Sequence, residues 1–154
     1  MLKKFILKKP FIPLSFTILV IILIAFYKKG YLADVQIFDA YFVLTINFLG
    51  GVFGMILLLD SIIYWLARNR KIVPMLTVVQ VIGTIGITLY LICVMGSPPN
   101  SRIALGKILT IDEYRHLNEL NMQFILGIAM LGLMQLLLVV NLIIGLMNKR
   151  TANL

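Results

Sequence analysis

The stretch "MILLLDSIIYWLARNRK", residues 55–71, indicates the class of protein. Its first part is an apolar run of the kind that crosses a lipid bilayer, and it ends in Arg68, Arg70 and Lys71. Basic residues at the end of an apolar run are typical of the cytoplasmic end of a membrane span. One carboxylate, Asp60, interrupts the run. An acid inside a span needs an explanation because a charge in hydrocarbon is costly.

The whole chain has the composition of an integral membrane protein. Of its 154 residues, 61% are hydrophobic and 13% are charged, whereas soluble domains have roughly 45–50% apolar and about 25% charged residues. The apolar residues form blocks at 10–27, 41–67, 74–95 and 122–148. Each block is long enough to cross a hydrocarbon core of about 30 Å as a helix. The sequence therefore predicts a single all-α domain, an integral membrane four-helix bundle that covers 1–154.

The net charge of +8 is distributed unequally between the two sides of the predicted bundle. The side with both chain ends and the turn at 68–73 has nine basic residues and no acidic one. These are Lys3, Lys4, Lys8, Lys9, Arg68, Arg70, Lys71, Lys149 and Arg150. The positive-inside rule then predicts cytoplasmic termini in a bacterial inner membrane. The same distribution favours contact with anionic lipid, or with a cytoplasmic protein partner, over contact with nucleic acid.

The segment 96–121, which connects the third and fourth blocks, is predicted outside. It begins with "GSPPNS", residues 96–101, a turn signal that ends the third helix. Thr110 with Glu113 three residues later has the capping-box pattern of a helix start. Apolar residues then recur at helical spacing opposite a charged face. We expect an amphipathic helix that either lies on the outer membrane surface or continues into the fourth span.

Polar residues fall inside the predicted spans at common depths. Asp60 lies eight residues before Arg68, so a rise of about 1.5 Å per residue places it roughly 12 Å below the cytoplasmic surface. The same arithmetic puts Ser15, Gln80 and Asn141 in that layer, and Thr84 and Gln135 near the midplane.

Polar groups that face lipid are costly, so we expect this layer to point into the bundle or into a subunit interface. Asp60 should then be neutral, or hydrogen-bonded to Gln80 or Asn141. The layer would act as a clasp between helices, as a proton or cation site, or as a switch that responds to the state of the membrane.

Small and aromatic residues in the second block predict helix contacts and an interface. Gly50 and Gly54 are four residues apart, a pattern that lets two helix backbones approach closely. That contact is either within the chain or between subunits, and we expect homo-oligomers built partly on this face. Tyr64 and Trp65, near the cytoplasmic end of the block, fit an interfacial aromatic belt.

No pattern in the sequence predicts a catalytic residue, a metal site or a cofactor. The single cysteine cannot form a disulfide within the chain. The single histidine, His116, is predicted on the opposite side of the membrane from Asp60, and glycine-rich phosphate loops are absent. Two functions are left. The first is a non-enzymatic membrane subunit that homo-oligomerises, senses or scaffolds, and recruits a cytoplasmic partner. The second is a small proton- or cation-coupled transporter or channel that uses Asp60.

The layout of the chain resembles two kinds of four-span protein from bacterial accessory elements. These are the membrane subunit of Kiwa-type anti-phage defence systems and the pore-forming colicin immunity proteins. The shared features are the size, the four spans, the short basic cytoplasmic parts and one longer outer segment, 96–121. The first resemblance implies a homo-oligomeric membrane subunit that works with a cytoplasmic DNA-binding protein. The second implies lateral recognition of a toxin helix in the membrane.

Overall fold

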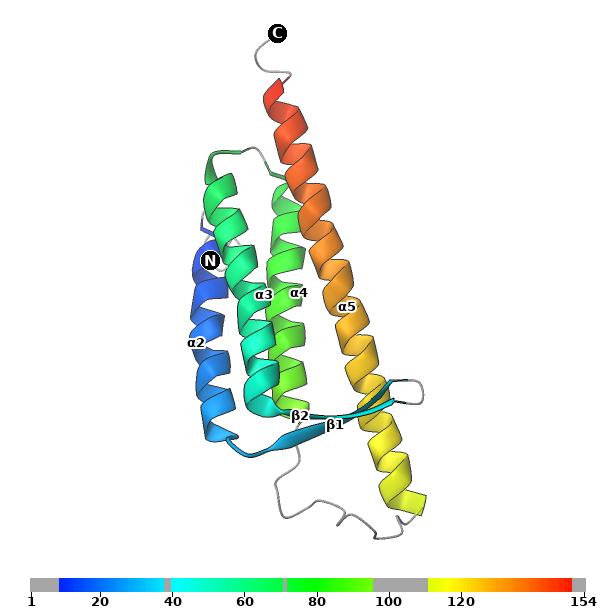
Figure 1. The fold of residues 1–154 in the computed structure, drawn as a ribbon. Helices are drawn as coiled ribbons and strands as arrows, with labels where there is room; N and C mark the ends of the chain where they lie inside the picture. Colours follow the sequence, from blue (N-terminus) through cyan, green and yellow to red (C-terminus); the bar gives the residue numbers. More distant parts are fainter. Residues whose placement is uncertain (1–8, 38–39, 71, 96–110, 151–154) are drawn as a thin grey trace.

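The computed structural model describes residues 9–37, 40–70, 72–95 and 111–150. In this part of the chain four α-helices run up and down beside one another (Figure 1). The helices are α2 (Phe11–Tyr27), α3 (Ile46–Leu66), α4 (Pro74–Val94) and α5 (Ile111–Arg150). Two strands, β1 (Leu32–Ile37) and β2 (Ala40–Thr45), lie between α2 and α3, and a short 3-10 helix, η1 (Ala67–Asn69), follows α3.

Three segments of these helices are long and apolar enough to cross a membrane. They are Ile46–Asn69, Pro74–Val94 and Arg115–Met147. The first helix, α2, is also apolar but has 17 residues. For these three helices the prediction of a helical membrane bundle is confirmed, and the chain is a multi-pass membrane protein.

The two ends of the bundle carry different structures (Figure 1). The start of α2, the turn after α3 and the C-terminal end of α5 lie at one end, which we call the basic end because Lys9, Arg68 and Arg70 are exposed there. The two strands and the start of α5 lie at the other, which we call the hairpin end.

The strands correct the prediction that 41–67 is one helical span. β1 and β2 form an antiparallel hairpin whose register runs from Leu32↔Thr45 to Ile37↔Ala40. The second long helix therefore begins at Ile46 and not at residue 41.

The physical reasons for the hairpin are local. Gly30, with a φ of 88°, turns the chain out of α2 in a conformation that glycine adopts without a Cβ penalty. Ala33 and Val35 alternate into the core, as on the packed face of a strand. Thr45 then ends β2 and caps α3, because its side-chain oxygen accepts a hydrogen bond of 3.2 Å from the backbone N–H of Phe48.

The last helix, α5, is continuous over 40 residues. At 1.5 Å per residue that is about 60 Å, roughly twice the thickness of a hydrocarbon core. Of the two alternatives for the amphipathic helix, the described part, from Ile111 onward, runs straight into the span. Residues 96–110 lie outside the described part of the chain.

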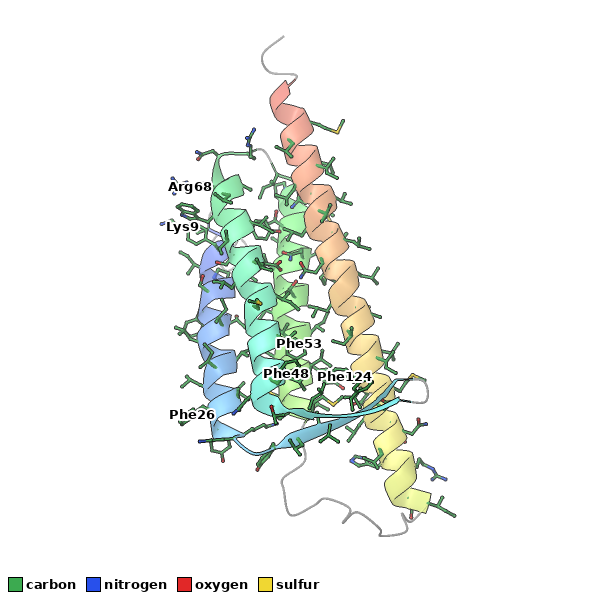
Figure 2. The ribbon with its side chains drawn as sticks, in the orientation of Figure 1. Lys9, Phe26, Phe48, Phe53, Arg68 and Phe124 are labelled. Carbon is green, nitrogen blue, oxygen red and sulfur yellow. The ribbon has the colours of Figure 1, made fainter. Side chains whose placement is uncertain are left out.

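The apolar core lies between the helices and closes under the hairpin. Phe53 of α3 and Phe124 of α5 are both buried and lie toward the hairpin end (Figure 2). Val35 of β1 is 1% exposed and belongs to the same core. The hairpin thus covers one end of the bundle and also contacts α5.

Candidate functional site

A cluster of polar side chains surrounds Asp60, which is 1% exposed in the C-terminal third of α3. The Oδ2 atom of Asp60 accepts a hydrogen bond of 2.8 Å from Nε2 of Gln80 on α4. It accepts a second, of 3.2 Å, from Nε2 of Gln135 on α5. Gln135 was predicted in a deeper layer than Asp60, but its long side chain reaches the carboxylate. These two bonds tie α3 to both α4 and α5.

Gln80 is the centre of this cluster and makes two further contacts. The hydroxyl of Tyr64 donates to Oε1 of Gln80 at 2.9 Å. Nε2 of Gln80 also lies 3.2 Å from Oγ1 of Thr84, one turn further along α4. Tyr64 is 1% exposed, which corrects its prediction as an interfacial aromatic residue. A buried tyrosine usually finds a hydrogen-bond partner for its hydroxyl, and here that partner is Gln80.

Asn141 makes a second set of hydrogen bonds, and the Tyr64 hydroxyl links this set to the cluster of Asp60 because it also interacts with Asn141 and Thr77. Its Nδ2 donates to Oγ1 of Thr77 at 2.9 Å, and its Oδ1 accepts from the backbone N–H of Val73 at 2.8 Å. The hydroxyl of Thr77 donates in turn to the carbonyl of Val73 at 3.1 Å. This cluster fastens α5 to the first turn of α4.

Ser15 makes a third contact, between α2 and α3. Its Oγ lies 2.8 Å from Oγ of Ser61. The hydroxyl of Ser61 also lies 3.2 Å from the carbonyl of Phe11 at the start of α2. Ser61 is next to Asp60 in sequence, but it faces α2 whereas Asp60 faces α4 and α5. The predicted layer is therefore divided among three contacts, which together tie all four helices.

Three residues of these contacts are not among those predicted in the layer: Tyr64, Thr77 and Ser61. A usable signal existed, since Tyr64 follows Asp60 by four residues and Thr77 precedes Gln80 by three. Residues at these spacings lie on the same face of a helix. Tyr64 and Thr77 therefore each share a helix face with a residue that was predicted in the layer. Ser61 directly follows Asp60, and no helical spacing from Asp60 would select it.

The polar side chains of the three contacts are already hydrogen-bonded inside the bundle. Throughout the described ranges, every buried side-chain nitrogen and oxygen atom has a hydrogen-bond partner. The donors to Asp60 are the side-chain amides of Gln80 and Gln135, which are uncharged. Within the same ranges, no group of three His, Cys, Asp or Glu side chains is arranged to hold a metal ion. A fully satisfied polar network fixes the relative positions of helices.

The two predicted packing glycines have different surroundings. A Cβ atom on Gly50 would lie 2.8 Å from Cβ of Ala25 on α2 and 3.3 Å from Cδ1 of Ile92 on α4. Of the two alternatives for this face, Gly50 therefore makes the contact within the chain. A Cβ on Gly54 would meet no atom within 4 Å.

The basic end exposes its charges around a short ordered turn. The guanidinium carbon of Arg68 lies 5.2 Å from the centroid of the Trp65 ring, which is a cation–π distance. The N–H of Arg70 donates to the carbonyl of Ala67 at 2.9 Å, and the N–H of Ile72 donates to the carbonyl of Arg70 at 3.0 Å. Lys71 lies outside the described residues, as do the side chains of Lys149 and Arg150 at the end of α5.

Comparison of the chain with protein-family models, with curated proteins and with solved structures finds no match.

Proposed function

We propose that this chain is a non-enzymatic inner-membrane subunit that assembles with copies of itself and holds a cytoplasmic partner at its basic end. The observation that carries the proposal is the cluster at Asp60. Its carboxyl group is buried and receives hydrogen bonds from two amides on two other helices. A group used in this way positions helices, and a scaffold needs helices in fixed positions.

The proposal includes α2 as a fourth span. The helix has 17 residues, the lower limit for a transmembrane helix. It packs along α3 and joins it through Ser15 and Ser61 (Figure 1). Lys9 lies just before the helix and Lys28 and Lys29 just after it, so charged side chains mark both ends.

The basic end is proposed to be cytoplasmic. Exposed Lys9, Arg68 and Arg70 lie there, and the positive-inside rule places such residues in the cytoplasm. At the hairpin end, Lys28 instead donates from Nζ to the carbonyls of Ile92, at 3.2 Å, and Cys93, at 2.5 Å. A cation at the C-terminus of α4 is favourable for the helix dipole, so this charge has a structural role that is independent of topology.

The proposed sensing function depends on α5. The helix extends past the hairpin at its N-terminal end, where Asp112, Arg115 and His116 are exposed (Figure 1). The same continuous helix brings Gln135 to Asp60 and Asn141 to the turn at the basic end. A partner that binds outside and shifts or rotates α5 would therefore change contacts at the cytoplasmic surface.

The resemblance in layout to the Kiwa-type membrane subunit supports placing this function in bacterial anti-phage defence. In that setting the cytoplasmic partner would be the component that contacts nucleic acid, and this chain would contact none directly.

The experiment that tests the proposal compares assembly with transport. Crosslinking in the membrane should give multiples of the 17.4 kDa chain. Proteoliposomes should show the same proton and potassium flux as empty liposomes, and Asp60→Asn should change neither result. If the wild-type protein carries flux that Asp60→Asn abolishes, the scaffold proposal fails.

The second candidate is a proton- or cation-coupled carrier that uses Asp60. The observation that favours it is the same buried carboxyl group, because its hydrogen bonds come from uncharged amides and not from a cation. Acidic residues within membrane spans often mark proton or ion pathways. The flux measurement separates this candidate from the scaffold.

A further inference from the structure

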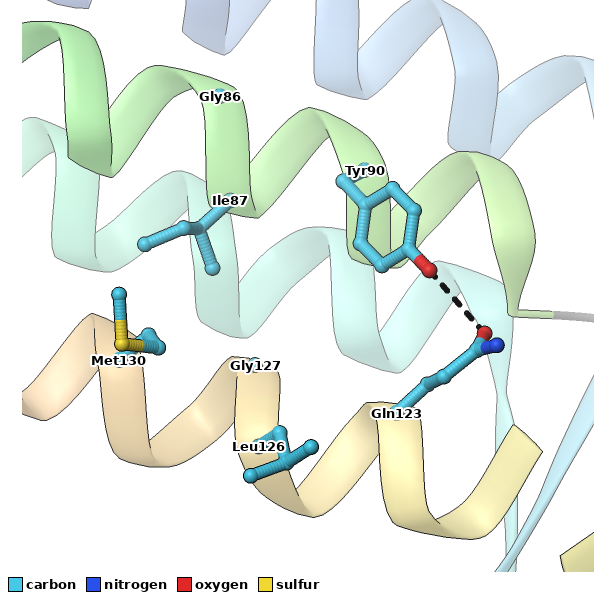
Figure 3. Close-up of a pocket in the computed structure, with 7 residues that line it drawn as sticks. All are labelled: Gly86, Ile87, Tyr90, Gln123, Leu126, Gly127 and Met130. Carbon is cyan, nitrogen blue, oxygen red and sulfur yellow. Dashed lines mark hydrogen bonds between the residues drawn. The ribbon is translucent and has the colours of Figure 1, made fainter. Parts of the chain in front are cut away.

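An open groove of about 330 Å³ lies between α4 and α5 on the outside of the bundle (Figure 3). Helix α4 contributes Gly86, Ile87 and Tyr90 to its lining. The lack of a side chain at Gly86 leaves space between the two helices, since a Cβ there would meet no atom within 4 Å, whereas Leu91 fills the space over Gly127 on α5. The groove does not include Asp60 or any residue of the three polar contacts.

The position of the groove along the helices fixes its depth in the bilayer. Tyr90 lies four residues before Val94, the last residue of α4, so it is about 6 Å from that end of the helix. Gly86 is about 6 Å deeper again, and on α5 Met130 lies about 10 Å deeper than Gln123 by the same rise. The groove therefore begins near the interface at the hairpin end and runs toward the middle of the membrane.

The two ends of the groove differ in chemistry. At the shallow end, the hydroxyl of Tyr90 donates to Oε1 of Gln123 at 3.1 Å (Figure 3). This bond uses the oxygen of the Gln123 amide and leaves the N–H groups of Nε2 for an acceptor outside the chain. The deeper lining, Ile87, Leu126 and Met130, is apolar.

We propose that the groove binds one phospholipid, with an acyl chain over Gly86 and an ester or phosphate oxygen accepting from Nε2 of Gln123. The lining matches such a molecule in order, with a donor at interfacial depth and an apolar trough in the hydrocarbon.

The decisive variant is Gly86→Leu, which fills the groove. A Cβ on Gly86 meets no atom within 4 Å, so the substitution is expected to leave the fold intact. The matched control is Gly132→Leu, at an exposed position of α5 outside the groove where a Cβ also meets no atom within 4 Å. A second variant, Gln123→Leu, keeps the trough and removes the donor.

The measurement is native mass spectrometry of protein purified in mild detergent from vesicles of phosphatidylethanolamine and phosphatidylglycerol. Wild type and Gly132→Leu should retain one phospholipid per chain. Gly86→Leu should retain about tenfold less, which corresponds to about 1.4 kcal/mol, and Gln123→Leu should also retain less. A phospholipid with a diazirine in its acyl chain should label peptides that contain Ile87 or Met130.

Equal retention by the wild type and both groove variants would overturn the proposal. So would a crosslink between two copies through cysteines placed at Ile87 or Leu126, because it would show that a second chain occupies the groove. If Gly86→Leu does not fold, Gln123→Leu decides the question by itself, since unchanged retention in that variant contradicts the proposed donor.

Discussion

The side-chain oxygen of Asn141 on α5 accepts a hydrogen bond of 2.8 Å from the backbone N–H of Val73, the residue that precedes α4. The first residue of α4 is Pro74, which has no N–H group and suits the first turn of a helix. Asn141 satisfies the neighbouring donor from a helix 68 residues away in sequence. The turn that carries Arg68 and Arg70 is thereby fixed to the last helix of the bundle.

Replacing Asn141 by Ala should loosen α5 from this turn. The variant loses the hydrogen bonds to Val73 and Thr77, and hydrogen bonds between membrane helices average about 0.6 kcal/mol each, so the free energy of unfolding should fall by about 1 kcal/mol. Unfolding in sodium dodecyl sulfate, followed by circular dichroism, measures the change. Val140→Ala, at an exposed neighbouring position, is the control. Equal losses in both variants would show that the bonds of Asn141 contribute nothing.

The surroundings of Gly50 and Gly54 predict that the same substitution is destabilising at the first and nearly neutral at the second. Gly50→Ala places a methyl group 2.8 Å from Cβ of Ala25, which is too close, and overpacking of this kind costs about 1–3 kcal/mol. Gly54→Ala meets no atom and should be nearly neutral. The double variant Gly50→Ala, Ala25→Gly should regain stability because the small residue moves to the other helix. The same unfolding assay checks all three, and failure of the double variant to recover would contradict the contact.

Asp60 should tolerate Asn better than Leu. The amide oxygen of Asn can still accept from Gln80 and Gln135, whereas Leu leaves both donors without their acceptor. At about 0.6 kcal/mol per bond, Leu should lower the free energy of unfolding by about 1 kcal/mol without abolishing folding. A larger loss in Asn than in Leu would mean that the ionised carboxylate itself is required.

The proposed orientation is tested with single cysteines in a Cys93→Ser background. A cysteine at Asp112, exposed near the start of α5, should react with an impermeant thiol reagent in intact cells. A cysteine at Asn69, exposed in the turn at the basic end, should react only after the cells are lysed. The reverse pattern would place the basic end outside.

Neutralising the basic turn should release a cytoplasmic partner. The variant changes Arg68, Arg70 and Lys71 to Gln. A matched variant changes Lys3, Lys4 and Lys149, which lie near the chain ends. Attraction to anionic lipid, at about 1 kcal/mol per basic residue, falls equally in the two. Docking depends on the fixed turn, so the first variant alone should lose a protein that co-purifies with the wild type while staying in the membrane.

Equal behaviour of the two triple variants, or wild-type protein that purifies without a companion, would leave the charges with a topological role only. The co-purified material is compared by mass spectrometry. Membrane retention is checked by fractionation, so that loss of the partner is not confused with loss of the protein.

The sequence alone determined that the chain is a bundle of apolar helices, and it gave the bounds of α4 almost to the residue. The reason is that hydrocarbon leaves no water to satisfy backbone groups, so a long apolar run must form a helix. The same rule missed the hairpin. In β2, Leu44 is partly buried against the core while Phe42 and Val43 are exposed. A short apolar run of this kind does not distinguish a strand from the start of a helix.

The tertiary structure decided which polar residues meet. Depth along a helix follows from counting residues, and this placed Asp60 and Gln80 at a common level. Rotation about the helix axis does not follow, because a span is apolar on nearly all sides and its periodicity does not mark the inner face. Packing between helices sets that rotation. It directed Gln135 to Asp60, Asn141 to Val73 and Gly50 to Ala25.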